Sequence, residues 1–109
     1  MFKEVKAMLP ISGNGYDDEI ILQIEAAVLD LETSTEIRLP GRVNITKNEQ
    51  TGIITDNSTL TDKLAVTVIA TWCSMRIGNP PNYEQLLRAY NSLKGQMRMS
   101  SRYNGRAEE

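Results

Sequence analysis

Apolar residues recur every three or four positions in three segments of the 109-residue chain, and this helical spacing constrains its fold more than any other feature. The segments span residues 17–34, 58–77 and 82–99. Because each apolar stripe has to be buried against another element, the sequence predicts a mainly α protein, a small helical bundle around one core. The stripes comprise, in chain order, Ile20, Ile21, Ile24, Ala27, Val28 and Leu31; Leu64, Ala65, Val68, Ile69, Trp72, Cys73 and Met75; and Tyr83, Leu86, Leu87, Tyr90, Leu93 and Met97.

Polar residues indicate where these helices begin. Asp17 or Asp18 is expected to cap the first helix, and the acids of its first turn also suit the positive end of a helix. Ser58 or Thr59 is expected to start the second, and Asn82 to cap the third. We interpret the acids as helix-start residues, not metal ligands, because the remaining ligand spacing of a calcium loop is missing.

A shorter helix is expected over residues 2–9, which makes a bundle of three to four helices. Pro10 ends it, because proline disfavours the helical conformation of the preceding residue. The apolar side of this short helix comprises Phe2, Val5, Met8 and Leu9.

The segment 38–57 changes character. Two β-prone stretches, residues 43–46 and 53–55, flank a polar turn at residues 48–52, so a small hairpin or an extended loop is predicted before the central helix. A two-stranded hairpin is marginal alone in water and needs support from the helices or from a neighbouring subunit. A loop of this length is either functional or a tolerated surface excursion.

Composition argues against catalysis. The chain has no histidine and a single cysteine, Cys73, which removes most zinc sites and the Ser–His and Cys–His pairs of nucleophilic enzymes. Trp72 and Cys73 are expected in the core. We therefore expect a protein that is not an enzyme and that has no catalytic, cofactor-binding or metal-binding residues.

Helical periodicity is lost after Met99, so one helical domain over residues 1–99 and an extended C-terminal arm over residues 100–109 are expected. Gly95 interrupts the last stripe and marks a close helix contact, a bend or a tolerated flaw. The chain has no apolar run of the roughly 18 residues that a membrane span needs, and its first residues lack the apolar stretch of a signal peptide. A cytoplasmic protein without membrane contact is expected.

Charge is segregated along the chain. Residues 7–37 contain seven acidic side chains and no basic one, whereas residues 85–107 contain five basic side chains and no acidic one. Two interpretations stay open. The two sets neutralise each other within one monomer, or they mediate contacts between neighbouring copies or with an acidic partner.

Four segments together resemble one protein family. Residues 86–103, LLRAYNSLKGQMRMSSRY, resemble the ending Y-x-x-L/Q-K-x-Q-L-x-x-S-x-x-Y of head–tail connector proteins from phages of Gram-positive bacteria. Residues 45–60, ITKNEQTGIITDNSTL, are similar to the loop before the central helix of those proteins. The acids at 17–19 with the isoleucine-rich helix that follows, and GNPP at 78–81, fit the same layout. The resemblance covers about residues 16–103, and Gly95, Met97 and Met99 depart from the pattern.

The resemblance implies a structural role without catalysis. Connectors of this family assemble, usually as twelve copies, into a ring beneath the portal protein. The ring extends the DNA channel, through which DNA passes without sequence readout, and it joins the capsid to a stopper or tail-completion protein. The chain is then expected in the host cytoplasm during assembly and later in the virion neck, and as a monomer in dilute solution.

Two sets of residues are carried over by position from the family. The end of the last helix and the arm would reach the portal protein or an adjacent subunit through Met97, Arg98, Met99, Arg102, Tyr103 and Arg106. The loop would project into the ring or its lumen with Lys47, Asn48, Glu49 and Gln50. The basic last helix also allows an alternative, a small helical regulator that binds nucleic acid.

Overall fold

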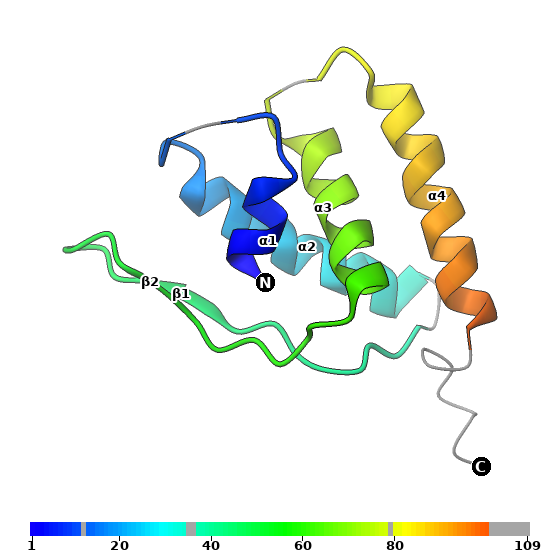
Figure 1. Cartoon of the computed structure of the whole chain (residues 1–109), viewed down its shortest axis with the longest axis horizontal. Helices are drawn as coiled ribbons and strands as arrows, with labels where there is room; N and C mark the ends of the chain where they lie inside the picture. The colour runs from blue at the N-terminus through cyan, green and yellow to red at the C-terminus, as the bar shows by residue number, and fades with distance from the viewer. Residues whose placement is uncertain (12, 35–36, 79, 101–109) are drawn as a thin grey trace.

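The structure, a computed structural model, describes residues 1–11, 13–34, 37–78 and 80–100. Its elements are, in chain order, α1 (Phe2–Ala7), α2 (Asp17–Ser34), β1 (Ile45–Lys47), β2 (Ile54–Asp56), α3 (Lys63–Arg76) and α4 (Tyr83–Met99) (Figure 1). This confirms the prediction of a mainly α bundle with a small hairpin before the central helix. The expected arm over residues 100–109 lies, apart from Ser100, outside the described residues.

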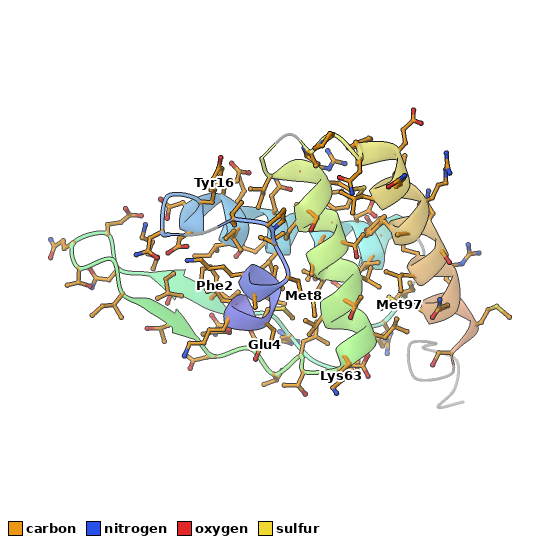
Figure 2. The ribbon with its side chains drawn as sticks, turned by 45° about the horizontal axis from the view of Figure 1, so that its top comes forward. Phe2, Glu4, Met8, Tyr16, Lys63 and Met97 are labelled. Atoms are coloured by element: carbon orange, nitrogen blue, oxygen red, sulfur yellow. The ribbon has the colours of Figure 1, made fainter. Side chains whose placement is uncertain are left out.

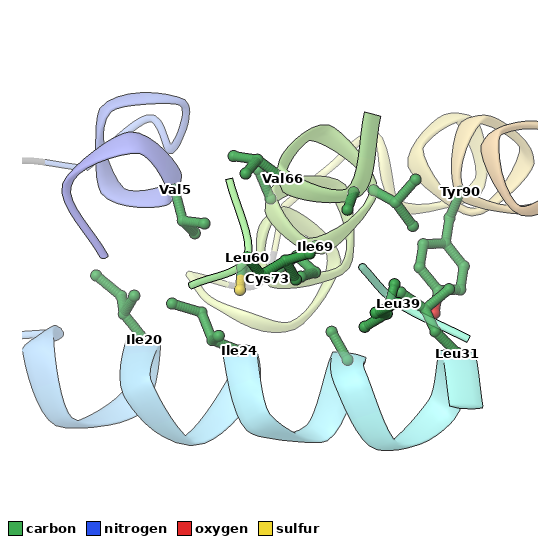
Figure 3. Close-up of a cluster of buried hydrophobic side chains, with 14 of the residues drawn as sticks. Val5, Ile20, Ile24, Leu31, Leu39, Leu60, Val66, Ile69, Cys73 and Tyr90 are labelled. Carbon is green, nitrogen blue, oxygen red and sulfur yellow. The ribbon is translucent and has the colours of Figure 1, made fainter. Parts of the chain in front are cut away.

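The helices form two layers. In Figure 3, α2 runs along the base of the core, and α1, α3 and α4 lie above it. Val5 of α1 and Tyr90 of α4 reach toward the two ends of α2, near Ile20 and Leu31 respectively. Four residues of the predicted stripe of α2, Ile20, Ile24, Ala27 and Leu31, have no exposed surface, and the other two, Ile21 and Val28, are partly buried against the core. A single core therefore runs the length of α2.

α3 is the central helix. It packs against α1, α2 and α4, and for this reason it is apolar on almost every side. Two threonines are accommodated in it because the Thr67 and Thr71 hydroxyls each donate a 2.8 Å hydrogen bond to the carbonyl four residues earlier. The side chains of α3 that are buried are Ala65, Val66, Val68, Ile69, Ala70, Cys73 and Met75.

The expected start of α3 is wrong by several residues. The helix begins at Lys63, and Asp62 is its cap, with Oδ2 accepting a 3.2 Å hydrogen bond from the N–H of Ala65. Ser58 and Thr59 do not start the helix because their hydroxyls accept hydrogen bonds from the N–H groups of Asn44 and Arg42, both at 2.9 Å. The two hydroxyls thus bond to the backbone of residues 42 and 44, which is distant in sequence, and not to the first turn of α3.

The other helix starts also differ from expectation. α2 begins at Asp17 itself, so that both Asp17 and Asp18 are first-turn residues and neither precedes the helix as its cap. Asn82 does occupy the cap position of α4, but its side chain makes no capping hydrogen bond. α1 ends at Ala7 and not at Leu9 as expected, and Met8, which the sequence places on the apolar side of this helix, is 52% exposed.

The hairpin pairs β1 and β2 in antiparallel register, with Ile45 opposite Asp56 and Lys47 opposite Ile54. Backbone hydrogen bonds continue the pairing below the strands, from Asn57 N to Asn44 O at 2.8 Å and from Thr59 N to Arg42 O at 2.8 Å. Ile45 is buried, so the base of the hairpin is part of the core. The support that an isolated hairpin lacks comes from the bundle of the same chain.

The molecule is elongated, with principal extents of 46 × 32 × 20 Å. The turn of the hairpin lies at one end of the long axis and α4 lies at the other (Figure 1). The two segments that the sequence singles out for assembly are therefore far apart in the monomer.

Candidate functional site

The end of α4 divides its residues between core and surface. Met97 is fully buried and packs in the core of its own chain, as its position at the inner side of α4 shows (Figure 2). Arg98 is exposed, and Met99 is 90% exposed. Of the residues expected at the portal or subunit interface, Arg98 and Met99 thus remain as surface groups. The other three, Arg102, Tyr103 and Arg106, lie outside the described residues.

The outer part of α4 also carries apolar surface. Tyr83 and Leu87 are 40% and 38% exposed, although both belong to the stripe that the sequence assigns to the core. Leu86 and Leu93 are partly buried against the core, and Tyr90 is buried. The exposed pair lies one turn apart and forms a small apolar patch near the N-terminal end of α4.

The hairpin turn is rigid by its own hydrogen bonds. Asn48 Oδ1 accepts from the N–H groups of Gln50 at 2.9 Å and Thr51 at 3.1 Å, and Gly52 N donates to Asn48 O at 2.7 Å. Gly52 has φ +74°, a conformation that favours glycine. Asn48 therefore shapes the turn, while Glu49 and Gln50 are exposed at its tip beside Ile53, which is 64% exposed.

Lys47 ties the hairpin to α2. Its Nζ lies 3.0 Å from Oδ1 of Asp18, and this hydrogen bond raises the pKa of Lys47 above its ordinary value. Of the four loop residues expected to project into a ring, Lys47 is thus held by its own chain, and Glu49 and Gln50 have side chains that point to solvent without a described partner.

Asp56 anchors the other strand and was not singled out by the sequence. Its Oδ2 accepts a 2.7 Å hydrogen bond from the N–H of Phe2, and its Oδ1 accepts one of 3.0 Å from the N–H of Ser58. Partial burial by itself would raise the pKa of the Asp56 carboxyl. The hydrogen bonds from Ser58 and Phe2 outweigh that effect, and the pKa lies well below its ordinary value. Asp56 joins the hairpin to α1.

Some of the segregated charge is neutralised within the monomer. Oδ2 of Asp30 on α2 accepts hydrogen bonds from the Tyr90 hydroxyl at 2.6 Å and from Lys94 Nζ at 3.2 Å. Burial, reinforced by the bond to Asp30, raises the pKa of Tyr90. Tyr90 also contacts the ring of Trp72, with the ring centroids 5.3 Å apart. This cluster ties α2, α3 and α4 together.

Other members of the two charged sets stay unpaired. Glu25 and Glu32 on α2 and Arg88 and Arg98 on α4 are exposed, and none of the four forms an ion pair or side-chain hydrogen bond with another described residue. Neutralisation within the monomer is thus found for some of the charged residues, and contact of the others with a partner stays a prediction. Asp30 and Lys94 pair internally, whereas these four charges are available for a partner.

One groove is lined by charged side chains that, apart from Lys3, are paired with one another. It has a volume of about 770 Å³ and lies between α1 and the hairpin. Lys6 at its wall pairs with Asp17 at 2.8 Å and with Asn14 at 3.2 Å, and Asp56 is held as described above. Cys73 is buried elsewhere in the core, where burial raises the pKa of its thiol to about 12.

The described residues contain neither a cluster of metal ligands nor a membrane-spanning helix. No cluster of three or more acidic, histidine or cysteine side chains that could hold a metal ion occurs among them. Within the same residues, no helix combines the length and the apolar character that crossing a membrane requires.

Comparison with known proteins adds no relative: neither a family model, nor a curated protein, nor a solved structure matches this chain.

Proposed function

We propose that the chain is a head–tail connector subunit of a tailed bacteriophage, a structural protein that forms a ring beneath the portal protein. In this role it extends the DNA channel and joins the capsid to a stopper or tail-completion protein. It performs no catalysis and binds no cofactor. It passes from the host cytoplasm to the virion neck as assembly proceeds.

The observation that carries the proposal is the layout of exposed groups on the elongated bundle. A rigid hairpin tip with Glu49 and Gln50 lies at one end, and the basic, apolar end of α4 with Arg98 and Met99 lies at the other. A ring subunit needs unlike surfaces that contact different partners, because a heterologous contact joins one patch to a different patch on the next copy. The resemblance of residues 45–60 and 86–103 to connector proteins supports the same role.

The test is electron microscopy of the negatively stained protein, alone and mixed with portal protein. We expect annular particles at high concentration or on portal rings, and monomers in dilute solution. Loss of portal binding on replacing Met99, but not on replacing Glu84 at the far end of α4, would support a portal contact at the C-terminal end of α4. A chain that neither associates with itself nor binds portal protein under any condition contradicts the proposal.

A second function, a small nucleic-acid-binding regulator, is favoured by the two exposed, unpaired arginines of α4. Arg88 and Arg98 could contact phosphates. Duplex binding of this kind weakens steeply with salt, since each phosphate contact releases condensed counterions. Tight, salt-sensitive duplex binding by a monomer would favour this second function, whereas rings that bind portal protein and show no affinity for duplex would exclude it.

A further inference from the structure

The outward face of α2 has the composition of a protein interface. Leu22 and Leu29 are 58% and 62% exposed and lie two turns apart. Glu25 and Glu32 each follow one of these leucines by three residues, so all four side chains lie along one line of the helix. The buried residues of α2, Ile20, Ile24, Ala27 and Leu31, lie on the opposite side, toward α1, α3 and α4 (Figure 3). We call the line of Leu22, Glu25, Leu29 and Glu32 the α2 face.

A second line on α4 has complementary character. Tyr83, Leu87 and Arg98 fall on one side of the helix at spacings of four and eleven residues, and Arg88 stands next to Leu87. Both arginines are exposed and unpaired among the described residues. We call Tyr83, Leu87, Arg88 and Arg98 the α4 face. Each face thus combines two exposed apolar side chains with two unpaired charges, acidic on α2 and basic on α4.

The two faces do not pair with each other within one monomer. Between the described residues of α2 and α4, the hydrogen bonds join Asp30 to Tyr90 and to Lys94, and none of them involves a residue of either face. The α2 face points away from the core that these groups enclose. An acidic, apolar face and a basic, apolar face that are both unpaired therefore fit a second copy of the same chain.

We propose that the chain self-associates head to tail, with the α2 face of one copy on the α4 face of the next. The contact buries Leu22 and Leu29 against Tyr83 and Leu87, and it pairs Glu25 and Glu32 with Arg88 and Arg98. Glu25 and Glu32 also line a groove of about 490 Å³, together with Val28, Val43, Arg38 and Arg42, and this groove offers depth for an incoming side chain. This inference rests on the proposed ring and assigns the surfaces that build it.

Charge reversal tests the contact in both directions. One variant carries Glu25→Lys and Glu32→Lys, and the other carries Arg88→Glu and Arg98→Glu. Since all four side chains are exposed and unpaired, both variants should fold as the native chain does, as circular dichroism checks. In sedimentation velocity at low salt, each variant alone should self-associate at least about tenfold more weakly than the native chain, because like charges then face each other.

Two restorations make the test specific. An equimolar mixture of the variants should associate again, because each reversed face meets a complementary one on the other chain. A single chain that carries all four substitutions should also associate. The control, Lys3→Glu with Lys63→Glu, changes net charge by the same amount as the Arg88 and Arg98 pair but lies outside both faces, and it should associate like the native chain.

The contact is overturned if the native chain stays monomeric at high concentration and low salt, if both variants associate normally, or if the mixture does not restore association. Binding of the native chain to portal protein is measured in parallel. If the chain binds portal protein but does not use the α2–α4 contact, only this inference is overturned and the connector proposal stands. If the chain self-associates through these faces but does not bind portal protein, the connector proposal is overturned and this inference stands.

Discussion

Asp56 shows how much one side chain can contribute when its partners come from distant parts of the chain. Its carboxylate holds the backbone of Phe2, 54 positions away, as well as that of Ser58. Because these bonds favour the charged form, they connect the protonation of Asp56 to the stability of the fold.

Replacing Asp56 with Asn is expected to lower the free energy of unfolding at pH 7 by about 1–3 kcal/mol, the usual cost of losing hydrogen bonds to a charged group. The pKa of Asp56 is lower in the folded chain than in the unfolded chain, so the stabilisation is complete above about pH 4 and is lost as the pH falls below it. Urea denaturation of native and variant chains should therefore differ at pH 7 and converge toward pH 2. Asp18→Asn, at a carboxylate that is 72% exposed, serves as control and should change stability by under about 0.5 kcal/mol.

Gly95 lies within α4, and a Cβ atom added there would meet no other atom within 4 Å. Of the three interpretations that the sequence left open, a close helix contact is therefore wrong. Gly95→Ala is expected to raise the free energy of unfolding by about 0.5–1 kcal/mol, because alanine restricts the unfolded chain and favours the helix. Chemical denaturation measures the difference.

Gly41, unlike Gly95, has no room for a side chain. It has φ +154°, and an added Cβ atom would lie 2.8 Å from the backbone of Leu60 and Thr59. Gly41→Ala should therefore destabilise the chain, and equal effects at the two positions would contradict this account of both.

At the scale of elements, local patterns predict the helices and miss what distant residues do. The stripe of α2 and the broad apolar surface of α3 follow from spacing alone, and both are buried as expected. The start of α3 was misplaced because Ser58 and Thr59, good capping residues by type, bond to Asn44 and Arg42 instead. No sequence spacing signals that pairing.

In the candidate site too, local patterns predict some features, and contacts between distant residues determine the others. Exposure at Glu49 and Gln50 was foreseeable from a polar turn between two β-prone stretches. Met97 is buried because it lies seven residues, or two helical turns, after Tyr90 and therefore on the same buried side of α4. Met99 lies two residues further on and points to another side. The role of Asp30 was not foreseeable, because its partners lie 60 and 64 positions away.

Removing residues 99–109 is expected to leave the fold largely intact and to abolish docking on the portal protein. Met99 is 90% exposed, and the last core residue of α4, Met97, is retained. Circular dichroism and a binding assay with portal protein test the two halves of this prediction. An unfolded truncated chain, or one that still docks normally, would contradict it.

At the scale of the whole molecule, one core joins α1, α2, α3 and α4, so these helices should unfold together. Trp72 reports on this directly, because its Nε1 donates to Gln23 Oε1 at 3.0 Å and its ring contacts Tyr90. We expect unfolding followed by Trp72 fluorescence to coincide with unfolding followed by helical circular dichroism, as in a two-state domain. Separate midpoints would mean that α4 or α1 comes away before the rest.

The backbone hydrogen bonds at the base of the hairpin make its turn a suitable place for a label. Residues 41–42 contact the backbone of residues 59–60, which holds both ends of the hairpin segment against the core. A change in the length of the turn should therefore have little effect on the packing of the helices. The Gln50–Thr51 link is consequently a natural graft point. A fluorophore or short epitope inserted there would ride on the far tip of each subunit and would mark which way the subunits face in any assembled particle.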